Sequence, residues 1–303
     1  MDERDHTRQG AVVTELTRNQ GITDLRARIR EHWDRLSPGA QEVCRILSEI
    51  TPEQLLYKSA VELGAETRTS NATVVRTLQS LGYAGLAELK TAIARPFTDQ
   101  TAPEVRARRR IEAIGGNLPD IWDKVTNEWI DRISLLRAES SAQAYQRAVE
   151  LLLGAREIVP FGFGSSFVVA DHLTLKLRRL GRRARTIRSS GFGLPDDLLG
   201  IERGDVVVVF APGRILVDLE VLLDRIRTVG AGSVLVTAEL ADQLKDLVGV
   251  TLIAPHSPTG LTGDAATAMV VADVLIQAIA AADPATTVET SHTLNTLRQQ
   301  MGF

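Results

Sequence analysis

A short stretch rich in glycine and serine carries the residue types that bind an anion. Gly162, Gly164, Ser165 and Ser166 directly follow a β-forming run (157–161) and precede a helical pattern. Glycines allow a ligand to approach the backbone, and the N–H groups and dipole of a helix N-terminus favour negative charge. The spacing therefore predicts an anion-binding loop between a strand and a helix. In the alternative interpretation, one serine only caps the helix, since serine is a favoured cap residue.

The same stretch does not fit a dinucleotide-binding fingerprint. Phe167 stands where the third glycine would be, and the next β-forming run leads into Ser189 and Ser190 without an acidic residue for a ribose. The only cysteine, Cys44, lies in an apolar helical pattern, which indicates a buried and inert thiol. We therefore predict no cofactor, no metal site and no catalytic residue.

A second group of residues could contact DNA. Ser70 stands where an N-cap belongs, and Val74, Leu78 and Leu81 follow at helical spacing as a core stripe. The residues predicted to face outward and to contact DNA are Ser70, Asn71, Thr73, Arg76 and Thr77, with Ser80 outward beside them. Short polar side chains and an arginine on one helix face are what a recognition helix brings into the major groove. A plain helical hairpin with a solvated polar face is the alternative.

The elements around these residues indicate two domains, as 303 residues would suggest. Helical periodicity runs from Leu25 to about Ala94, where Arg95-Pro96 is predicted to end it. Short β-forming runs later alternate with helices, which predicts a doubly wound parallel sheet. The predicted strands are 157–161, 185–188, 206–210, 233–237 and 250–253.

We therefore expect an all-α helix-turn-helix domain followed by an α/β domain. The predicted ranges are a flexible or marginally helical tail (1–23), the helix-turn-helix domain (24–95), a linker (96–120), the α/β domain (121–285) and a C-terminal helix (286–303).

The N-terminal pattern resembles the RpiR/MurR family of transcriptional regulators. The similarity covers residues 36–50, the hairpin 59–81 and residues 81–94, and it is strongest in SNATVVRTLQSLGYAGLAELK (70–90). Two positions depart from the family pattern. Arg68 replaces a turn glycine, which costs about 1 kcal/mol if the position needs a positive φ. Gly64 replaces an alanine within the first helix and loosens it slightly.

Residues 125–282 resemble the SIS (sugar isomerase) domain that accompanies this helix-turn-helix in the family. The resemblance implies a phosphosugar ligand, held by the first loop and by a hydroxyl-rich loop after the third strand. This chain has Ala211, Pro212, Gly213 and Arg214 there, so the expected hydroxyls are absent. Three possibilities follow: Arg214 restores phosphate binding, the effector is another acid or a neutral sugar, or the site is vestigial.

Together these patterns predict a cytoplasmic DNA-binding regulator that senses a sugar phosphate or a related sugar-derived effector. The net charge of −3 and the aromatic share of 4% argue against a polycation and against a platform for single strands. We expect the partners to be an operator duplex, the effector and a second copy in a dimer or tetramer. We expect no membrane, because polar residues interrupt the apolar run 265–282.

The main alternative is a sugar-phosphate isomerase. Such an enzyme needs a positioned carboxylate or histidine to move protons. The candidates are Asp171, His172, His256, Glu289 and His292, and their spacing forms no diagnostic group. The basic run 106–110 is either a further contact to DNA phosphate or a solvated linker helix. A pure assembly protein is a third class, which specific DNA binding would exclude.

Overall fold

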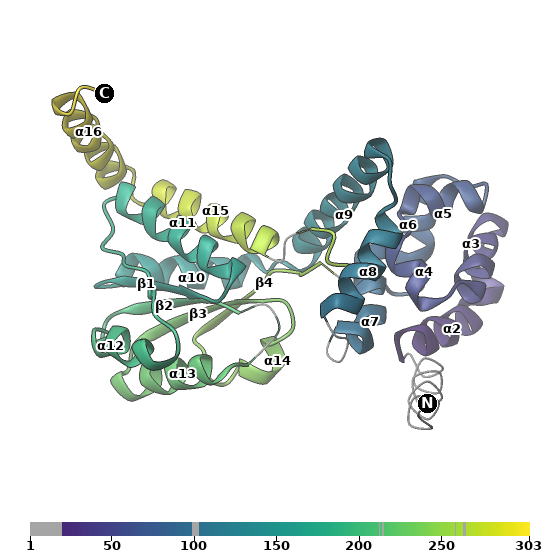
Figure 1. Ribbon diagram of the computed structural model, residues 1–303, viewed down its shortest axis with the longest axis horizontal. Coiled ribbons are helices and arrows are strands. Elements are labelled where there is room, and N and C mark those ends of the chain that lie inside the picture. Colours follow the sequence, from purple (N-terminus) through teal and green to yellow (C-terminus); the bar gives the residue numbers. More distant parts are fainter. Residues whose placement is uncertain (1–19, 99–102, 212, 214, 258, 263–264) are drawn as a thin grey trace, which may run out of the picture. The chain divides into compact units, whose positions relative to one another are not determined.

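The computed structural model describes residues 20–98, 103–211, 213, 215–257, 259–262 and 265–303. These residues form two compact units (Figure 1). A helical unit contains the chain up to Ala138 together with Ser257–Thr262, and an α/β unit contains Glu139–His256 and the chain from Gly263 onward. The division after Ala138 places most of the helix α9 (Leu118–Glu139) with the helical unit, whereas the α/β range predicted from the sequence begins at residue 121.

The helical unit packs short amphipathic helices around one apolar core. Its core includes Leu25, Val43, Leu47, Leu63 and Leu89, which are all fully buried. Apolar residues at helical spacing on each segment make this packing possible. The helices are α2 (Gln20–His32), α3 (Pro38–Glu49), α4 (Pro52–Tyr57), α5 (Ala60–Glu66), α6 (Asn71–Ser80), α7 (Leu86–Thr98), α8 (Pro103–Ile114) and α9 (Leu118–Glu139).

One predicted helix end in this unit is wrong, and a helix begins within the predicted tail. Helix α7 continues through Pro96 to Thr98, so the predicted end at Arg95-Pro96 is wrong. Proline only disfavours helix at the preceding residue, and tertiary packing can override that preference. Helix α2 begins at Gln20, inside the range predicted as a flexible or marginally helical tail, while residues 1–19 lie outside the described residues.

A buried polar cluster joins α9 to the segment Ser257–Thr262. The carboxylate of Glu128 accepts hydrogen bonds from the hydroxyls of Ser257, Thr259 and Thr262, the last at 2.8 Å. Arg132, only 1% exposed, donates to the same Thr262 hydroxyl at 2.7 Å. Because buried charges need such partners, these contacts hold the distant segment within the helical unit.

The α/β unit contains four parallel strands in the order β1-β2-β3-β4. They are β1 (Ile158–Gly162), β2 (Val206–Phe210), β3 (Gly232–Thr237) and β4 (Val250–Ile253). In β1 and β2 every residue is buried, as a sheet covered on both faces requires. These four strands confirm the sequence prediction to within a residue or two at their ends.

The fifth predicted strand, 185–188, does not form. Only Ala184 makes a bridge to Ile158, although the N–H groups of Arg185 and Ile187 still donate to β1 carbonyls. The segment therefore runs along the free edge of β1 without regular strand geometry. If it is counted, the strand order becomes 2-1-3-4-5, a common doubly wound arrangement.

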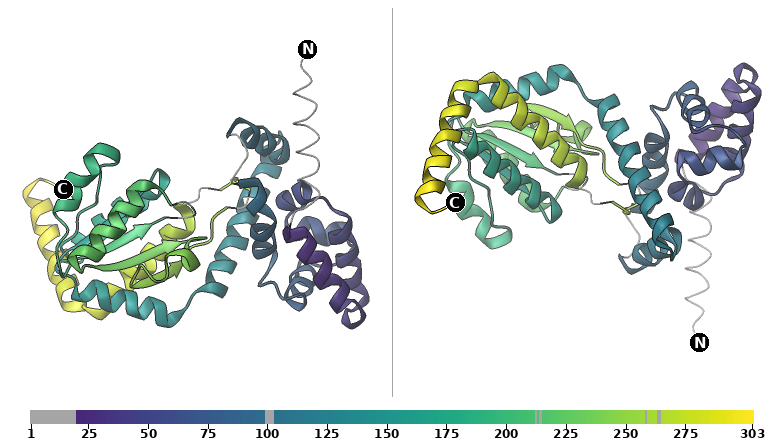
Figure 2. Two further views of the ribbon diagram at one scale, coloured as in Figure 1. Left: turned by 90° about the horizontal axis from the view of Figure 1, so that it is seen from below. Right: turned by 90° about the horizontal axis from the view of Figure 1, so that it is seen from above.

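Helices cover both faces of this sheet, as the two views in Figure 2 show. One layer contains α10 (Ala142–Gly154), α11 (Ser165–Arg179) and α15 (Ala265–Ala282). The other contains α12 (Leu194–Leu199), α13 (Val217–Val229) and α14 (Ala241–Leu244), whose apolar side chains pack on the β2 side chains Val207 and Val209. The last helix, α16 (Pro284–Gln300), has no buried residue.

Helix α15 is long and apolar enough to cross a membrane by length and composition alone. In the structure, however, it contributes seven buried residues to the α/β unit, among them Val271, Leu275 and Ile279. It packs against α10 and α11. These contacts are those of a core helix.

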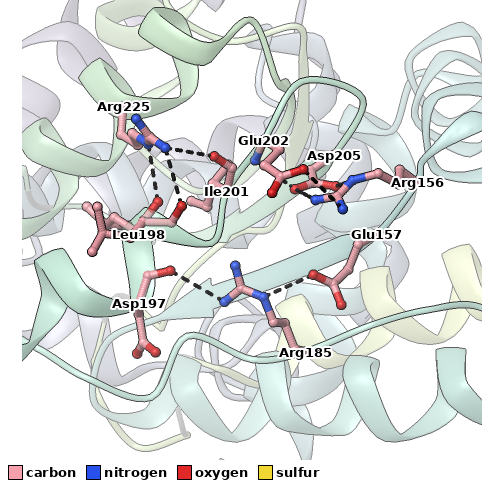
Figure 3. A network of polar contacts seen from close by, with 10 residues as sticks. Arg156, Glu157, Arg185, Asp197, Leu198, Ile201, Glu202, Asp205 and Arg225 are labelled. Carbon is pink, nitrogen blue, oxygen red and sulfur yellow. Dashed lines mark hydrogen bonds and ion pairs between the residues drawn. The ribbon is translucent and has the colours of Figure 1, made fainter.

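A polar network closes the amino edge of the sheet (Figure 3). Asp205, which precedes β2, is fully buried and accepts two hydrogen bonds from Arg156 at 2.9 and 2.8 Å. Arg185 donates to Glu157, which precedes β1, at 3.0 Å. Because these groups lie at the amino ends of the strands, the opposite, carboxyl edge is left to the loops that follow β1 and β2.

Candidate ligand site and nucleic-acid interface

The carboxyl edge of the sheet holds the predicted anion loop. Gly162 ends β1 and pairs in register with Phe210, the last residue of β2. In doubly wound sheets, ligands bind outside the carboxyl ends of the strands, where the strand order reverses. Here that point lies between β1 and β2, so the loops after these two strands form the candidate ligand site.

The first loop has the tight geometry that its glycines predict. A Cβ on Gly162 would lie 2.6 Å from the carbonyl oxygen of Ser166, so no side chain fits there. Gly164 adopts φ +50° and ψ −120°, a conformation that glycine adopts readily. Ser165, the first residue of α11, is exposed, whereas Ser166 is buried.

The alternative role of these serines as helix caps is not what the structure shows. Gly164 is the N-cap of α11, and among the described residues no side chain caps this helix. The N–H groups of Ser166 and Phe167 already donate to the carbonyls of Phe163 and Gly164, at 2.8 and 3.2 Å. The helix N-terminus therefore offers a ligand mainly the positive end of the α11 dipole.

The described residues of the second loop, Ala211 and Gly213, bring no side-chain donor. Ala211 is buried, and Gly213 is partly buried. The predicted site residue Arg214 and its neighbour Pro212 lie outside the described residues. A Cβ on Gly213 would lie 3.2 Å from Oε2 of Glu239, so a carboxylate rests against this loop.

Glu239 and His256 also lie at this edge of the sheet. The sequence pattern does not single out Glu239, and it offers His256 among the isomerase candidates. Glu239 follows β3 and His256 follows β4, and their side chains lie 3.5 Å apart, Oε1 to Nε2. The rule that ligand residues follow parallel strands at their carboxyl ends could have singled out Glu239.

The other isomerase candidates do not gather at this edge. Asp171 accepts hydrogen bonds from Thr186 and Arg188, and His172 pairs with Asp273 at 2.9 Å. Glu289 and His292 lie on α16 and are exposed. Within the described part of the chain, no group of three metal-binding side chains occurs.

In the helical unit, a short turn joins α5 to α6, and a serine caps the N-terminus of each helix. Ser59 and Glu62 make a reciprocal capping box on α5, and the Ser70 hydroxyl accepts the N–H of Thr73 at 3.1 Å on α6. The predicted cap at Ser70 is therefore confirmed. The predicted core stripe of α6 is also confirmed, because Val74 and Leu78 are fully buried.

The structure explains the two positions that depart from the family pattern, Arg68 and Gly64. Arg68 adopts φ +52°, so the position does need a left-handed backbone, and Arg68 bears that strain. A Cβ on Gly64 would lie 3.1 Å from the carbonyl oxygen of Thr69. Gly64 thus lets the turn pack closely against α5.

Most of the predicted DNA-contacting residues are accessible. Ser70, Asn71 and Arg76 are exposed, and Thr73 is partly buried. The outward position predicted for Thr77 is wrong: it is 2% exposed, and its hydroxyl donates to the carbonyl of Thr73 at 2.8 Å.

The chain has curated relatives, although no protein-family profile matches it. The bifunctional protein glk of Paraburkholderia xenovorans is 28% identical over 217 residues, which are 70% of this chain. This chain spans only about a third (32%) of that relative's length. The HTH-type regulator YbbH of Bacillus subtilis is 25% identical over 74% of this chain and 78% of its own. YfhH of Escherichia coli is 27% identical over 57% of this chain and 63% of its own.

Solved structures share the fold. The Vibrio vulnificus NanR protein, complexed with ManNAc-6P, covers 92% of this chain and 100% of its own, with 20% identity and a TM-score of 0.54. The sugar isomerase domain of an RpiR transcription factor from Sphaerobacter thermophilus covers 56% of this chain and 95% of its own, with 22% identity and a TM-score of 0.50. The α/β unit thus has the SIS-type fold. The similarity to RpiR-type transcriptional regulators that the sequence indicated is thus matched by two relatives named HTH-type transcriptional regulators and by the fold shared with these solved structures.

Proposed function

We propose that this protein is a cytoplasmic DNA-binding regulator whose α/β unit senses a sugar phosphate or a related sugar-derived molecule. The observation that supports DNA reading most directly is α6. It is a capped helix with one buried stripe, and Asn71 and Arg76 are exposed on its other face. That arrangement suits a helix that enters the major groove. Two relatives, YfhH and YbbH, are named HTH-type transcriptional regulators.

In this proposal Arg76 reads a guanine or a phosphate, and Asn71 reads an adenine or the backbone. Ser70 and Thr73 lie at the N-terminus of α6, where they support phosphate contacts. Thr77 has a packing role, because its hydroxyl is already engaged with the Thr73 carbonyl.

The sensing half of the proposal rests on the loop Gly162–Ser166. This loop lies at the carboxyl end of β1 and at the positive end of the α11 dipole, a position that favours a negatively charged or polar ligand. A second copy of the chain would complete a dimer that reads two half-sites. The effector would favour one arrangement of that dimer and so change operator affinity.

Selection from a random pool of DNA duplexes tests the DNA-reading half. The full chain should enrich a defined sequence, with affinity that falls as salt rises. Arg76→Ala should weaken that binding by at least tenfold. Arg45→Ala serves as the matched control, because Arg45 is an exposed arginine of the same unit whose charge is paired with Glu42. Equal loss in both variants, or no enrichment by the parent, would overturn the proposal.

A sugar-phosphate isomerase is the second candidate, and one observation favours it. Glu239 and His256 lie together at the carboxyl edge, and such a pair can move a proton. Turnover of aldose phosphates by the parent, lost in His256→Gln, would support this function. Sequence-specific DNA binding without turnover would exclude it.

A further inference from the structure

Arg68 stands at a backbone position that disfavours any residue with a Cβ. Its φ is +52°, and within the described ranges every other residue with a positive φ is a glycine. At the end of α5, the N–H of Arg68 donates to the carbonyl of Ala65 at 3.2 Å. The N–H of Thr69 donates to the carbonyl of Gly64 at 2.8 Å. This pair of bonds is the Schellman ending of a helix, and glycine is the usual residue at its left-handed position. The fold alone therefore favours glycine at position 68.

The side chain of Arg68 carries an exposed positive charge. No hydrogen bond or ion pair joins its guanidinium to a described residue. Hydrogen bonds from Arg45 hold the pKa of the Glu42 carboxyl below its ordinary value, and the charge of Arg68 acts in the same direction. Glu42 thus lies within electrostatic reach of Arg68, but two hydrogen bonds from Arg45 already engage that carboxylate. Arg68 therefore adds a cation to this surface without a packing contact or a paired acid among the described residues.

The turn that carries Arg68 lies beside the residues proposed to contact DNA. The methyl groups of Thr69 and Thr73 lie together at the first turn of α3, where a Cβ on Gly39 would be 3.8 and 3.7 Å from them. Arg68 precedes Ser70, the N-cap of α6, by two residues. A recognition helix brings its N-terminal end to the DNA, and phosphate groups line the rims of the groove that it enters. The turn therefore places Arg68 at the end of α6 that faces those phosphates.

We infer that Arg68 is a further DNA contact of this chain, and that its guanidinium binds a backbone phosphate beside the groove that α6 enters. This inference rests on the proposed DNA-reading function. A guanidinium matches a phosphate through two parallel hydrogen bonds. Strained backbone is concentrated at functional sites, and here the strain keeps a cation on a turn that glycine would complete with less cost. Because position 68 lies outside the recognition helix, Arg68 contributes affinity and not sequence preference.

Variants at position 68 separate DNA binding from folding in the full chain. Arg68→Gly and Arg68→Asn remove the charge, and both new residues accept a left-handed backbone. Arg68→Lys keeps the charge. Arg26→Ala is the control, because Arg26 is an exposed arginine of α2 in the same unit, whose guanidinium donates to the carbonyl of Ser48.

Two measurements are made on each variant. Fluorescence anisotropy gives the affinity for the duplex selected by the parent, and for a scrambled duplex, over a series of salt concentrations. Hydrogen exchange of peptides from α5 and α6 reports the stability of the helical unit.

Arg68→Gly and Arg68→Asn should weaken binding roughly fivefold or more at about 0.1 M salt, with a similar factor on both duplexes. The slope of log affinity against log salt should become shallower by about one, as the loss of one phosphate contact requires. Arg68→Lys should keep the slope of the parent, and Arg26→Ala should change affinity by less than about twofold, because a distant charge is screened at this salt. The α5 and α6 peptides should exchange no faster in Arg68→Gly than in the parent.

Unchanged affinity and slope in both neutral variants overturn the inference and leave the DNA-reading function intact. A loss confined to the selected duplex assigns Arg68 to a base and overturns the phosphate contact. A shallower slope in Arg68→Lys, an equal loss in Arg26→Ala, or faster exchange in both neutral variants also overturns it. If the parent enriches no duplex, the DNA-reading function itself fails, and the inference fails with it.

Discussion

Asp205 provides the sharpest stability prediction, because one arginine pairs with two carboxylates of very different burial. Asp205 is fully buried, and Glu202 has a side chain 64% exposed. Both carboxylates contact Arg156, Asp205 through two hydrogen bonds and Glu202 through one ion-pair contact at 3.2 Å. Changing each acid to its amide therefore compares a buried partner with an exposed partner of the same guanidinium.

The cost of Asp205→Asn follows from its hydrogen bonds. The carboxylate accepts two from Arg156 and one from the N–H of Glu202 at 2.9 Å. Whichever way the new amide turns, its NH2 group faces a donor, and hydrogen bonds to charged groups contribute about 1.5–3 kcal/mol each. Since the Arg156 side chain is 42% exposed and can turn toward water, we expect a loss of about 2–3 kcal/mol for Asp205→Asn. Glu202→Gln should cost at most about 1 kcal/mol, as exposed ion pairs do.

Native-state hydrogen exchange followed by mass spectrometry measures this effect in the α/β unit alone. Peptides that cover β1 and β2 should exchange roughly 30- to 150-fold faster in Asp205→Asn, the equivalent of that free-energy loss. Peptides from α6 in the helical unit serve as the internal reference. If Asp205→Asn accelerates exchange no more than Glu202→Gln does, the reasoning from burial and hydrogen bonding is wrong.

Four further outcomes are expected. Arg68→Gly should stabilise the helical unit by about 0.5–1 kcal/mol in the same exchange experiment, because it relieves the left-handed backbone at φ +52°, and no gain would mean that the turn is unstrained. Burial raises the pKa of the Cys44 thiol to about 11, so alkylation at pH 8 should be slow until the protein unfolds, and rapid labelling of the native chain would contradict its burial. Gly162→Ala should abolish effector binding, since its Cβ would meet the Ser166 carbonyl at 2.6 Å, and unchanged affinity would remove the loop from the site. Thr77→Val should leave DNA affinity within about threefold, and a larger loss would indicate a direct contact from this residue.

Much of the fold could be predicted because its signals are local. The apolar runs of β1 to β4 and the stripe of α6 depend on periodicity within a few residues, and they appear where that periodicity places them. Local periodicity does not decide whether the segment 185–188 forms a regular strand. Whether a β-forming run becomes a regular strand depends on its partner, and this one meets only the free edge of β1.

The candidate site was harder to predict because it is assembled from loops far apart in the sequence. The glycine loop carries its own signal, whereas Glu239 acquires its place only when β3 lies beside β2. Thr77 shows a different error. It stands three residues after Val74 and four before Leu81, so helical geometry already puts it beside the buried stripe. The prediction that Thr77 faces outward rested on the polarity of its side chain alone.

The central claim is that one chain reads DNA and responds to a sugar. The direct measurement is the anisotropy of a labelled duplex, chosen by selection, titrated with the full chain with and without the sugar that binds it. The account predicts that saturating sugar changes operator affinity by fivefold or more, and that Arg76→Ala lowers affinity in both states. Identical affinity with and without bound sugar would contradict it.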